Sequence, residues 1–349
     1  MKRIREFGIE IGSFPTGARN QITDVAGVKV GHKTLAKGEI QTGVTSIIPG
    51  EGNIFQEKFI AASHVFNGFG KTTGLVQINE LGTLETPILL TNTLSAGTCT
   101  TALVRYMLKQ DETIGSSTGT VNPVVGECND MVLNNIRNFS VSEADALEAL
   151  ENAQVNMQEG SVGAGRGMKC FGLKGGVGTS SRKLTYEHGE YTIGVLVLSN
   201  FGKLEEFRLN GQLVGPQLKT QLNEETDEVD KGSIMMIVAT DLPVTSSQLK
   251  RIIKRTGNGL SRTGSFMGNG SGDVVIGYST ANRVPHASKK LQQMRVVHEN
   301  DLDQAFLAVA DTTEEAILNS MVKAETVTGR NETTLHSLYK YIDNLMRRG

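Results

Sequence analysis

The feature that most constrains this chain is a run of small residues that delivers a serine to the start of an apolar segment. Residues 268–273 read Gly-Asn-Gly-Ser-Gly-Asp, and Val-Val-Ile follows at once at 274–276. The β-branched residues predict a buried strand, and the glycines predict a tight turn before it. The sequence therefore predicts that Ser271 is held where a turn enters a sheet.

Such a serine is compatible with two interpretations. In the first, the chain cuts its own bond between Gly270 and Ser271, and the freed serine becomes an N-terminal nucleophile. An α-amine has an unperturbed pKa of about 7.7–8.0, so its neutral form can accept the hydroxyl proton without a histidine. Ser271 would first attack the Gly270 carbonyl in an N→O acyl shift, with Gly268 and Gly270 permitting a strained backbone. In the second, the run is an ordinary turn before a strand.

Composition limits the function classes. The 349 residues are 38% hydrophobic and 21% charged, with a formal net charge of −2, so a globular protein is expected and nothing favours nucleic acid as a partner. No segment predicts a signal peptide or a membrane span, so no membrane partner is expected. The cysteines are odd in number and widely spaced, which predicts no disulfide framework and a cytoplasmic location; they are Cys99, Cys128 and Cys170.

The apolar patterns predict a mixture of strands and helices that does not alternate strictly. Strands are expected at residues 22–25, 28–32, 43–49, 87–93, 191–198, 233–240 and 274–279. Helices are expected at residues 97–109, 141–158, 242–255, 301–310 and 313–325. Serines are expected at two helix starts, Ser142 for the second helix and Ser246 or Ser247 for the third. The polar stretch 205–231 is expected to be an exposed loop or insert. This order indicates an α+β fold in layers.

Short cofactor motifs are incomplete in this chain. In residues 163–167 the third glycine comes one position too early for a dinucleotide loop, and residues 172–179 lack the Gly-Lys-Ser/Thr ending of a P-loop. The six histidines show no zinc-binding spacing. No Gly-x-Ser-x-Gly motif is centred on Ser271, although a Ser-His-Asp triad stays possible. We therefore expect no cofactor and no metal.

Longer motifs, collinear over nearly the whole chain, resemble the L-aminopeptidase/D-esterase family, also called the DmpA family, which includes the β-peptidyl aminopeptidases. The matching stretches are residues 20–32, 67–70, 86–93, 123–127, 162–165, 174–182 and 268–273. The resemblance implies a four-layer αββα sandwich, related to the N-terminal-nucleophile hydrolases but differently connected. It also implies one catalytic domain over residues 1–349, cut into 1–270 and 271–349, and a homo-oligomer, most simply a homotetramer.

Two polar residues that follow apolar strands are candidates for binding the substrate. Asn200 could donate to a developing oxyanion, and the resemblance assigns it that role; the alternative is a turn with Gly202. Glu127 could bind a substrate ammonium, and the resemblance assigns it that role; the alternative is a surface ion pair. The chain continues Cys-Asn-Asp-Met at 128–131, where the family more often has Thr, an aromatic residue or Asn, and then Asp-Gly. This departure leaves the pocket shape open.

The resemblance also implies a Ser-x-Glu unit near the C-terminus that assists the nucleophile. Thr312 and Glu314 match it, and a slip of one residue would give Thr313 and Glu315. A structural alternative is that Thr312 and Glu315 form a capping box that opens the last long helix.

The expected activity is that of a serine aminopeptidase without a cofactor. Ser271 would attack the first peptide, amide or ester bond of a small substrate with a free amino group, and water would release the acyl group. Two alternatives stay open. One is an acyl transferase like ornithine acetyltransferase, which shares the self-cleaving architecture but uses a threonine. The other is a non-catalytic member that binds a small molecule. The preference for α-, β- or D-aminoacyl groups is also left open.

Overall fold

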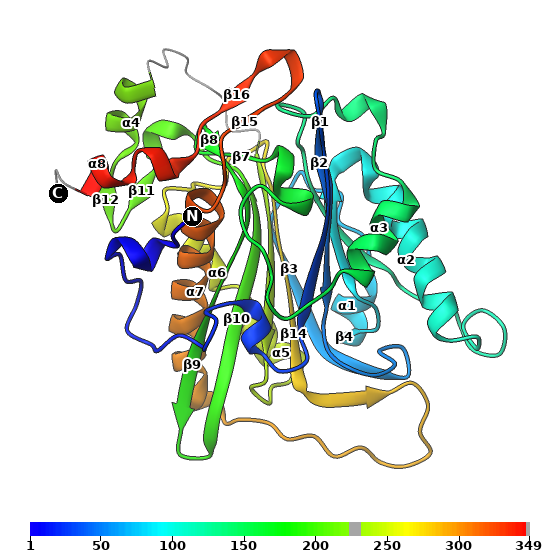
Figure 1. Ribbon diagram of the computed structural model, residues 1–349. Helices are drawn as coiled ribbons and strands as arrows, with labels where there is room; N and C mark the ends of the chain where they lie inside the picture. The colour runs from blue at the N-terminus through cyan, green and yellow to red at the C-terminus, as the bar shows by residue number, and fades with distance from the viewer. Residues whose placement is uncertain (223–231, 347–349) are drawn as a thin grey trace.

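Two β-sheets lie face to face between two layers of helices (Figure 1). The computed structural model describes residues 1–222 and 232–346. The four layers form the αββα sandwich that the resemblance implies, so the expected fold class is confirmed. No helix within the described ranges is both long enough and apolar enough to cross a membrane.

The larger sheet has six strands, and Asn200 and Ser271 lie at one end of it. Its order is β4 (Thr83–Leu84), β3 (Glu57–Gly68), β14 (Gly272–Pro285), β13 (Ser233–Thr240), β10 (Gly189–Asn200) and β9 (Gly176–Tyr186). Only β13 and β14 run parallel. Every residue of β13 is buried, as its continuous apolar run predicts for a strand covered on both faces.

The smaller sheet has four strands, and its inner face packs on the larger sheet. Its order is β1 (Lys29–Lys37), β2 (Ile40–Ile48), β5 (Ile88–Asn92) and β6 (Val124–Cys128). Apolar side chains from both sheets meet in one buried cluster, which includes Ile88 and Val124 from the smaller sheet and Leu196, Met235 and Ile276 from the larger. This core holds the ends of β6, β10 and β14 in fixed relation to one another.

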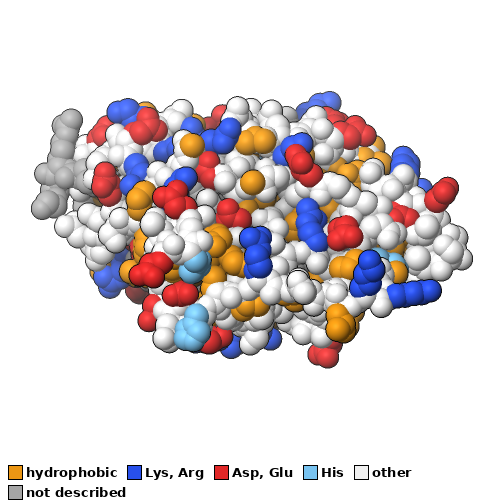
Figure 2. All heavy atoms as spheres, turned by 90° about the horizontal axis from the view of Figure 1, so that it is seen from below, with side chains coloured by type: hydrophobic (Ala, Val, Ile, Leu, Met, Phe, Trp, Pro, Cys, Tyr) orange, Lys and Arg blue, Asp and Glu red, His pale blue; other side chains and the backbone are white. Residues whose placement is uncertain are grey.

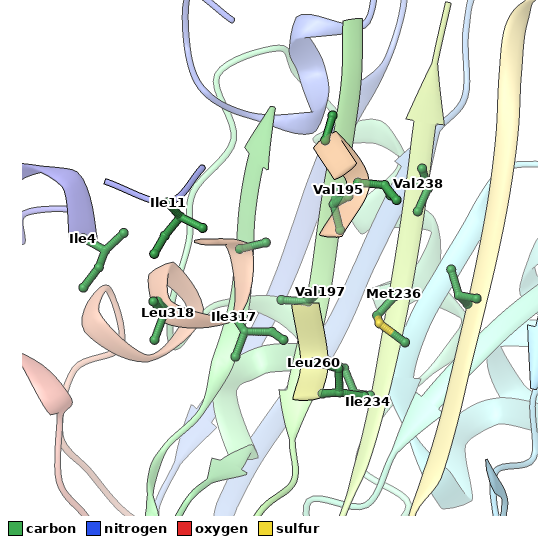
Figure 3. Packing of buried hydrophobic residues seen from close by; sticks show 14 of the residues in the cluster. Ile4, Ile11, Val195, Val197, Ile234, Met236, Val238, Leu260, Ile317 and Leu318 are labelled. Carbon is green, nitrogen blue, oxygen red and sulfur yellow. The ribbon is translucent and has the colours of Figure 1, made fainter. Parts of the chain in front are cut away.

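Helices cover the two outer faces. The larger sheet is covered by α5 (Ser246–Ile253), α6 (Thr256–Arg262) and α7 (Leu302–Val322), and the smaller sheet by α2 (Ala96–Gln110) and α3 (Glu143–Glu151). In Figure 3, Ile317 of α7 points toward Val197 of β10 and Leu260 of α6 toward Ile234 of β13, whereas Leu318 of α7 faces Ile4 and Ile11 of the N-terminal segment. Figure 2 views the opposite end from the candidate site, where acidic and basic side chains are interspersed.

Short elements complete the described structure. The helices are α1 (Leu75–Leu81), α4 (Gly215–Leu222) and α8 (Ile342–Met346). The short strands pair as β7 (Lys169–Cys170) with β8 (Leu173–Lys174), β11 (Arg208–Leu209) with β12 (Gln212–Leu213), and β15 (Val327–Thr328) with β16 (Thr334–Leu335). The stretch expected to be an exposed loop therefore contains a hairpin and α4, while its residues 223–231 lie outside the described part.

Three predictions of elements were wrong. The strand expected at residues 22–25 is a short 3-10 helix, Ile22–Asp24, and the helix expected at residues 141–158 already ends at Glu151. The two helices expected at residues 301–310 and 313–325 are one continuous helix, α7. The polar run at 311–315 does not interrupt it because those side chains are buried and satisfied; the Thr312 hydroxyl, for example, donates to the Ala308 carbonyl at 2.5 Å. The capping-box interpretation of Thr312 and Glu315 is therefore wrong, since both lie inside the helix.

The other helix starts were closer to the structure. Ser142 caps α3 as expected, and its hydroxyl accepts from the Asp145 N–H. The cap of α5 is Thr245 rather than Ser246 or Ser247. The three hydroxyl residues are adjacent, and only backbone conformation decides which of them stands outside the first turn.

Candidate active site

Ser271 lies where a tight turn enters β14. Its N–H donates to the Gly268 carbonyl at 2.8 Å, and the Asn67 side chain donates to the same oxygen at 2.5 Å. Ser271 is 1% exposed. The positive φ of this segment is at Met267, at 52°, and neither Gly268 nor Gly270 has a positive φ. The turn is thus closed by one hydrogen bond of its own and fixed to β3 by another, from Asn67.

The register of the larger sheet places Asn200 at the same end as Ser271. Asn200 of β10 pairs with Ser233 of β13, and Ser233 pairs with Gly272 of β14. Two strand spacings separate Asn200 from Gly272, which is about 10 Å. The two residues therefore lie at the same end of the larger sheet, with β13 between them.

The Asn200 side chain is held by two loops. Its Oδ1 accepts from the Lys169 N–H at 2.9 Å, and its Nδ2 donates to the Asn129 carbonyl at 3.0 Å. A simple Asn turn with Gly202 does not describe this arrangement, because both partners lie far away in sequence. An amide nitrogen carries two protons, so the contact with Asn129 leaves the second one for another acceptor.

Lys174 fixes the loop that holds Asn200. Its side chain is fully buried, and its ammonium donates to three backbone carbonyls of residues 165–175 at 2.8–3.0 Å. Burial lowers the pKa of Lys174 well below its ordinary value. Three acceptors nevertheless match the three protons of an ammonium, and we therefore assign the charged form. Residues 172–179 form an incomplete P-loop pattern and residues 174–182 match the family, but neither pattern predicted this role of the lysine.

Glu127 is a buried carboxylate at the end of β6. It is 2% exposed, its Oε1 accepts from the Lys71 N–H at 2.8 Å, and its Oε2 accepts from the Thr93 hydroxyl. Within residues 1–222 and 232–346 it has no Lys, Arg or His at salt-bridge distance. The surface ion pair considered for Glu127 is therefore wrong.

Gly70 separates the Glu127 carboxylate from the start of β14. A Cβ at Gly70 would lie 3.7 Å from the Gly272 Cα and 3.8 Å from Glu127 Oε1. Gly70 therefore lies between the Glu127 carboxylate and Gly272, the residue that follows Ser271. This arrangement joins the smaller sheet to the end of the larger one, which the sequence alone did not indicate.

Asp273 is a residue of the site that the sequence patterns did not predict. Its Oδ1 accepts a 2.6 Å hydrogen bond from the Ser271 hydroxyl, and it is 1% exposed. Residues two apart on a strand point to the same face, so the motif itself held this signal. The nearby Cys128 thiol is no rival nucleophile, because burial raises its pKa well above the ordinary value.

Thr312 lies on the outer face of the larger sheet. Its carbonyl accepts from the Ser180 hydroxyl at 2.8 Å. Ser180 of β9 is in register, across β10 and β13, with Gly277 of β14. Gly277 is five residues after Gly272, which is about 16 Å along the strand. Among the residues that the structure describes, Thr312 has no hydrogen bond to Ser271.

Glu314 and Glu315 differ in their surroundings. Burial raises the pKa of Glu314, whose carboxylate lies 3.5 Å from the Arg262 guanidinium. Glu315 is fully buried and pairs with Arg182 at 2.6 Å and with Arg5 at 2.9 Å. Its two ion pairs give Glu315 a structural role, so the register with Glu314 is the more suitable one for chemistry. The assisting role of Thr312 and Glu314 stays a prediction.

The fold and the site together define a class of protein. A serine that follows a glycine turn and opens a central strand of an αββα sandwich is the arrangement of an N-terminal-nucleophile hydrolase. The sequence model of peptidase family S58 matches residues 20–335 of this chain, and the chain belongs to this family.

Relatives agree with this assignment over nearly the whole length. The β-peptidyl aminopeptidase BapA of Sphingosinicella microcystinivorans is 36% identical over 359 residues, which cover 96% of this chain and 89% of that protein. The protein of the same name from Sphingosinicella xenopeptidilytica is 33% identical over 361 residues, covering 96% of this chain and 88% of that protein.

Solved structures show the same fold. The crystal structure of the PH0078 protein from Pyrococcus horikoshii OT3 has a TM-score of 0.94 at 45% identity and covers 99% of both chains. The L-aminopeptidase D-Ala-esterase/amidase from Ochrobactrum anthropi has a TM-score of 0.91 at 34% identity and covers 100% of this chain and 99% of that chain. It is described as a prototype for the serine aminopeptidases and as a new variant among the Ntn hydrolase fold.

Proposed function

We propose that this protein cuts itself between Gly270 and Ser271 and then removes the N-terminal residue from small peptides, amides or esters with a free amino group. The observation that carries the proposal is Glu127, a buried carboxylate held by neutral donors and facing the start of β14 across Gly70. An ionised group is costly to bury without a partner, and a substrate ammonium would supply one. The aminopeptidase names of the relatives support the same reading.

The proposed reaction begins at Ser271. Cleavage of the precursor turns its backbone nitrogen into an α-amine, which takes the hydroxyl proton as Oγ attacks the substrate carbonyl. The amine then passes the proton to the leaving group, and an acyl-enzyme forms. Water resolves this ester and regenerates the serine.

We propose that Asn200 stabilises the developing oxyanion. The Nδ2 proton that Asn129 does not use, together with backbone N–H groups, would donate to it. Because Lys169 and Asn129 hold the amide before substrate arrives, little reorganisation is needed during the reaction. A single pre-placed donor of this kind contributes about 3–4 kcal/mol to transition-state stability.

The test of the proposed function compares matched substrates with and without a free amine. Purified wild-type protein should hydrolyse amino acid p-nitroanilides and leave their N-acetyl forms nearly untouched. Panels of α-, β- and D-aminoacyl substrates then define the preference. Formation of acetylglutamate from acetylornithine and glutamate, without amide hydrolysis, would instead identify an acyl transferase.

Substitution of Gly70 tests whether the substrate occupies the space between Glu127 and Ser271. Gly70→Ala should fold, since the new methyl group meets only ordinary contacts of 3.7–3.8 Å and the residue has no positive φ. The methyl group would, however, occupy the path of the substrate, and one added carbon in a pocket costs roughly tenfold or more in kcat/KM.

Gly68→Ala is the matched control for this prediction, because nothing lies within 4 Å of a Cβ there. Steady-state kinetics on a free-amine p-nitroanilide checks both variants. Equal activity of the two would show that the substrate does not pass Gly70.

Metal removal should have no effect on hydrolysis. Within the described ranges, no group of three or more His, Cys, Asp or Glu side chains could hold a metal ion, and the proposed steps use only protein groups. Dialysis against EDTA should leave kcat/KM unchanged. A loss of activity that zinc restores would contradict the proposed chemistry.

We further propose a cytoplasmic homo-oligomer, most simply a homotetramer, in which Thr312 and Glu314 assist the Ser271 amine. The resemblance supports the assembly and the assisting pair. Cys99 and Cys128 are buried thiols outside any disulfide, which supports a reducing compartment. Among the described residues, neither Thr312 nor Glu314 has a hydrogen bond to Ser271, so the kinetics of Glu314→Gln must decide the role of the pair.

A further inference from the structure

In the proposed function, Ser271 and Asn200 meet the reacting carbonyl and Glu127 meets the ammonium. The rest of a peptide substrate must contact other side chains at the edge of the site. Two such side chains lie on residues 69–71, directly after β3. Phe69 is 62% exposed, and Lys71 is exposed as well. We call residues 69–71 the rim segment.

The backbone of the rim segment is fixed against the site. A Cβ at Gly272 would lie 2.6 Å from the Gly70 nitrogen and 3.1 Å from the Phe69 carbonyl carbon, so the segment packs directly on the first residue of β14. At the other end of the segment, the Lys71 N–H donates to Glu127 Oε1 at 2.8 Å. Because the backbone makes both contacts, the side chains of Phe69 and Lys71 can be changed without removing them.

The Lys71 ammonium is held in place by neutral groups. It donates to the Phe69 carbonyl and lies 4.4 Å from the centroid of the Phe69 ring, which is a cation–π contact. Within residues 1–222 and 232–346, no Asp or Glu lies at salt-bridge distance from it. An ammonium carries three protons, and the carbonyl accepts one of them. An anionic group of a ligand could therefore accept the others.

The charges at the site match those of a small peptide. Glu127 offers a buried carboxylate, and Lys71 offers an exposed ammonium. One four-carbon side chain separates this ammonium from the backbone whose N–H donates to Glu127. A dipeptide, whose two residues span at most about 7 Å, carries an ammonium and a carboxylate at a comparable separation. Such a substrate finds an opposite charge for each of its ends.

We propose that Lys71 binds a carboxylate of the substrate and makes the enzyme select acidic small peptides. This inference rests on the proposed function, because it concerns the substrate of the same site. The carboxylate has two sources: the C-terminus of the leaving amino acid in a free dipeptide, and the side chain of an N-terminal acidic residue. Either would bind the ammonium protons while the Phe69 ring keeps the lysine in place.

The test compares wild type with Lys71→Gln on two pairs of substrates. The first pair is a dipeptide and its C-terminal amide, both with leucine as the second residue and with the N-terminal residue that wild type removes fastest. The second pair is aspartyl and asparaginyl p-nitroanilide. Exposed charge pairs contribute modestly, so the ratio of kcat/KM for the charged over the neutral member should fall about two- to fivefold in the variant. Comparing ratios cancels any general loss of activity.

Charge, rather than shape, should govern this preference. Lys71→Arg keeps the charge and should keep the wild-type ratios, whereas Lys71→Glu reverses it and should lower the ratios further than Lys71→Gln does. Raising the ionic strength from about 0.01 M to about 1 M shortens the screening length from about 30 Å to about 3 Å. The wild-type preference for the charged member should therefore weaken with added salt.

Lys2→Gln is the matched control. Lys2 also lies over a phenylalanine, with its ammonium 5.5 Å from the centroid of the Phe7 ring, and Phe7 packs against Tyr339. Removal of this charge should leave both ratios at their wild-type values. Thermal unfolding shows whether each variant is folded. If Lys71→Gln is not, the salt dependence of the wild-type ratios decides instead.

The outcomes separate the two proposals. A wild type that hydrolyses no member of either pair overturns the proposed function, and this inference with it. An active wild type, together with unchanged ratios in folded Lys71→Gln for both pairs, overturns only the role of Lys71; so do salt-independent wild-type ratios if that variant is unfolded. A lower ratio in the dipeptide pair identifies the leaving carboxylate as the group bound, and a lower ratio in the p-nitroanilide pair alone identifies the acidic side chain. A second pair that wild type does not cleave excludes the side chain as the source and leaves the decision to the first pair.

Discussion

Ser271→Ala is expected to remain a single chain and to show no hydrolysis. Wild type should give two pieces, 1–270 and 271–349, in denaturing mass spectrometry. The substitution removes the hydroxyl that attacks Gly270 in the precursor and the substrate in the mature enzyme. Loss of a catalytic serine costs on the order of 10⁶-fold in kcat, so activity should fall to background. The same sample, assayed with a free-amine p-nitroanilide, checks both effects.

Ser279→Ala is the control for loss of a buried hydroxyl in the same strand. Ser279 is fully buried, and its hydroxyl donates to the Leu242 carbonyl at 2.7 Å. Its removal should cost about 1–3 kcal/mol of stability without blocking the cut. If Ser271→Ala is processed, or if it retains turnover, the nucleophile is another residue.

Glu127→Gln is expected to lower kcat/KM for free-amine substrates about ten- to hundredfold. The amide keeps the shape of the side chain but cannot form a charge-assisted contact with an ammonium. Such a contact contributes about 1.5–3 kcal/mol, and about 1.4 kcal/mol corresponds to a factor of ten. N-acetylated substrates should be poor for wild type and should lose little more in the variant.

Self-cleavage of Glu127→Gln should continue, because the bond before Ser271 offers no free amine. Glu85→Gln serves as the control: Glu85 is buried as well, but it pairs with Lys58 at 2.7 Å, away from the proposed binding groups. Its kinetics should match wild type as long as it is folded. Normal hydrolysis of free-amine substrates by Glu127→Gln would place the ammonium anchor elsewhere.

Local sequence patterns predicted most of the elements near the site. The apolar runs at 87–93, 191–198 and 233–240 correspond to β5, β10 and β13. These predictions are correct because a strand that is buried on both faces consists of a continuous run of apolar residues, and such a run can be recognised without knowing which strands lie beside it. The division of α7 failed because its carboxylates pair with arginines on other elements, as Glu315 does with Arg182 and Arg5, and local propensity does not include such partners.

The candidate site was predictable to the same extent. Ser271, Asn200 and Glu127 each follow or open an apolar strand, so their positions at strand ends could be expected. Their environments could not: that Glu127 is buried without a described cation depends on what three distant segments bring to it. The same holds for Lys174, whose three acceptors come from a folded loop.

The sequence by itself determined the turn before Ser271, the apolar strands around it and, through collinear motifs, the family. These are properties of neighbouring residues, since glycine permits the turn and β-branched side chains favour the strand. Only the tertiary structure decided that Asp273 accepts from Ser271, that Gly70 separates Glu127 from β14, and that Thr312 lies along α7 away from the turn. Those relations depend on strand register and on the packing of the two sheets, which arise from contacts between residues far apart in the chain.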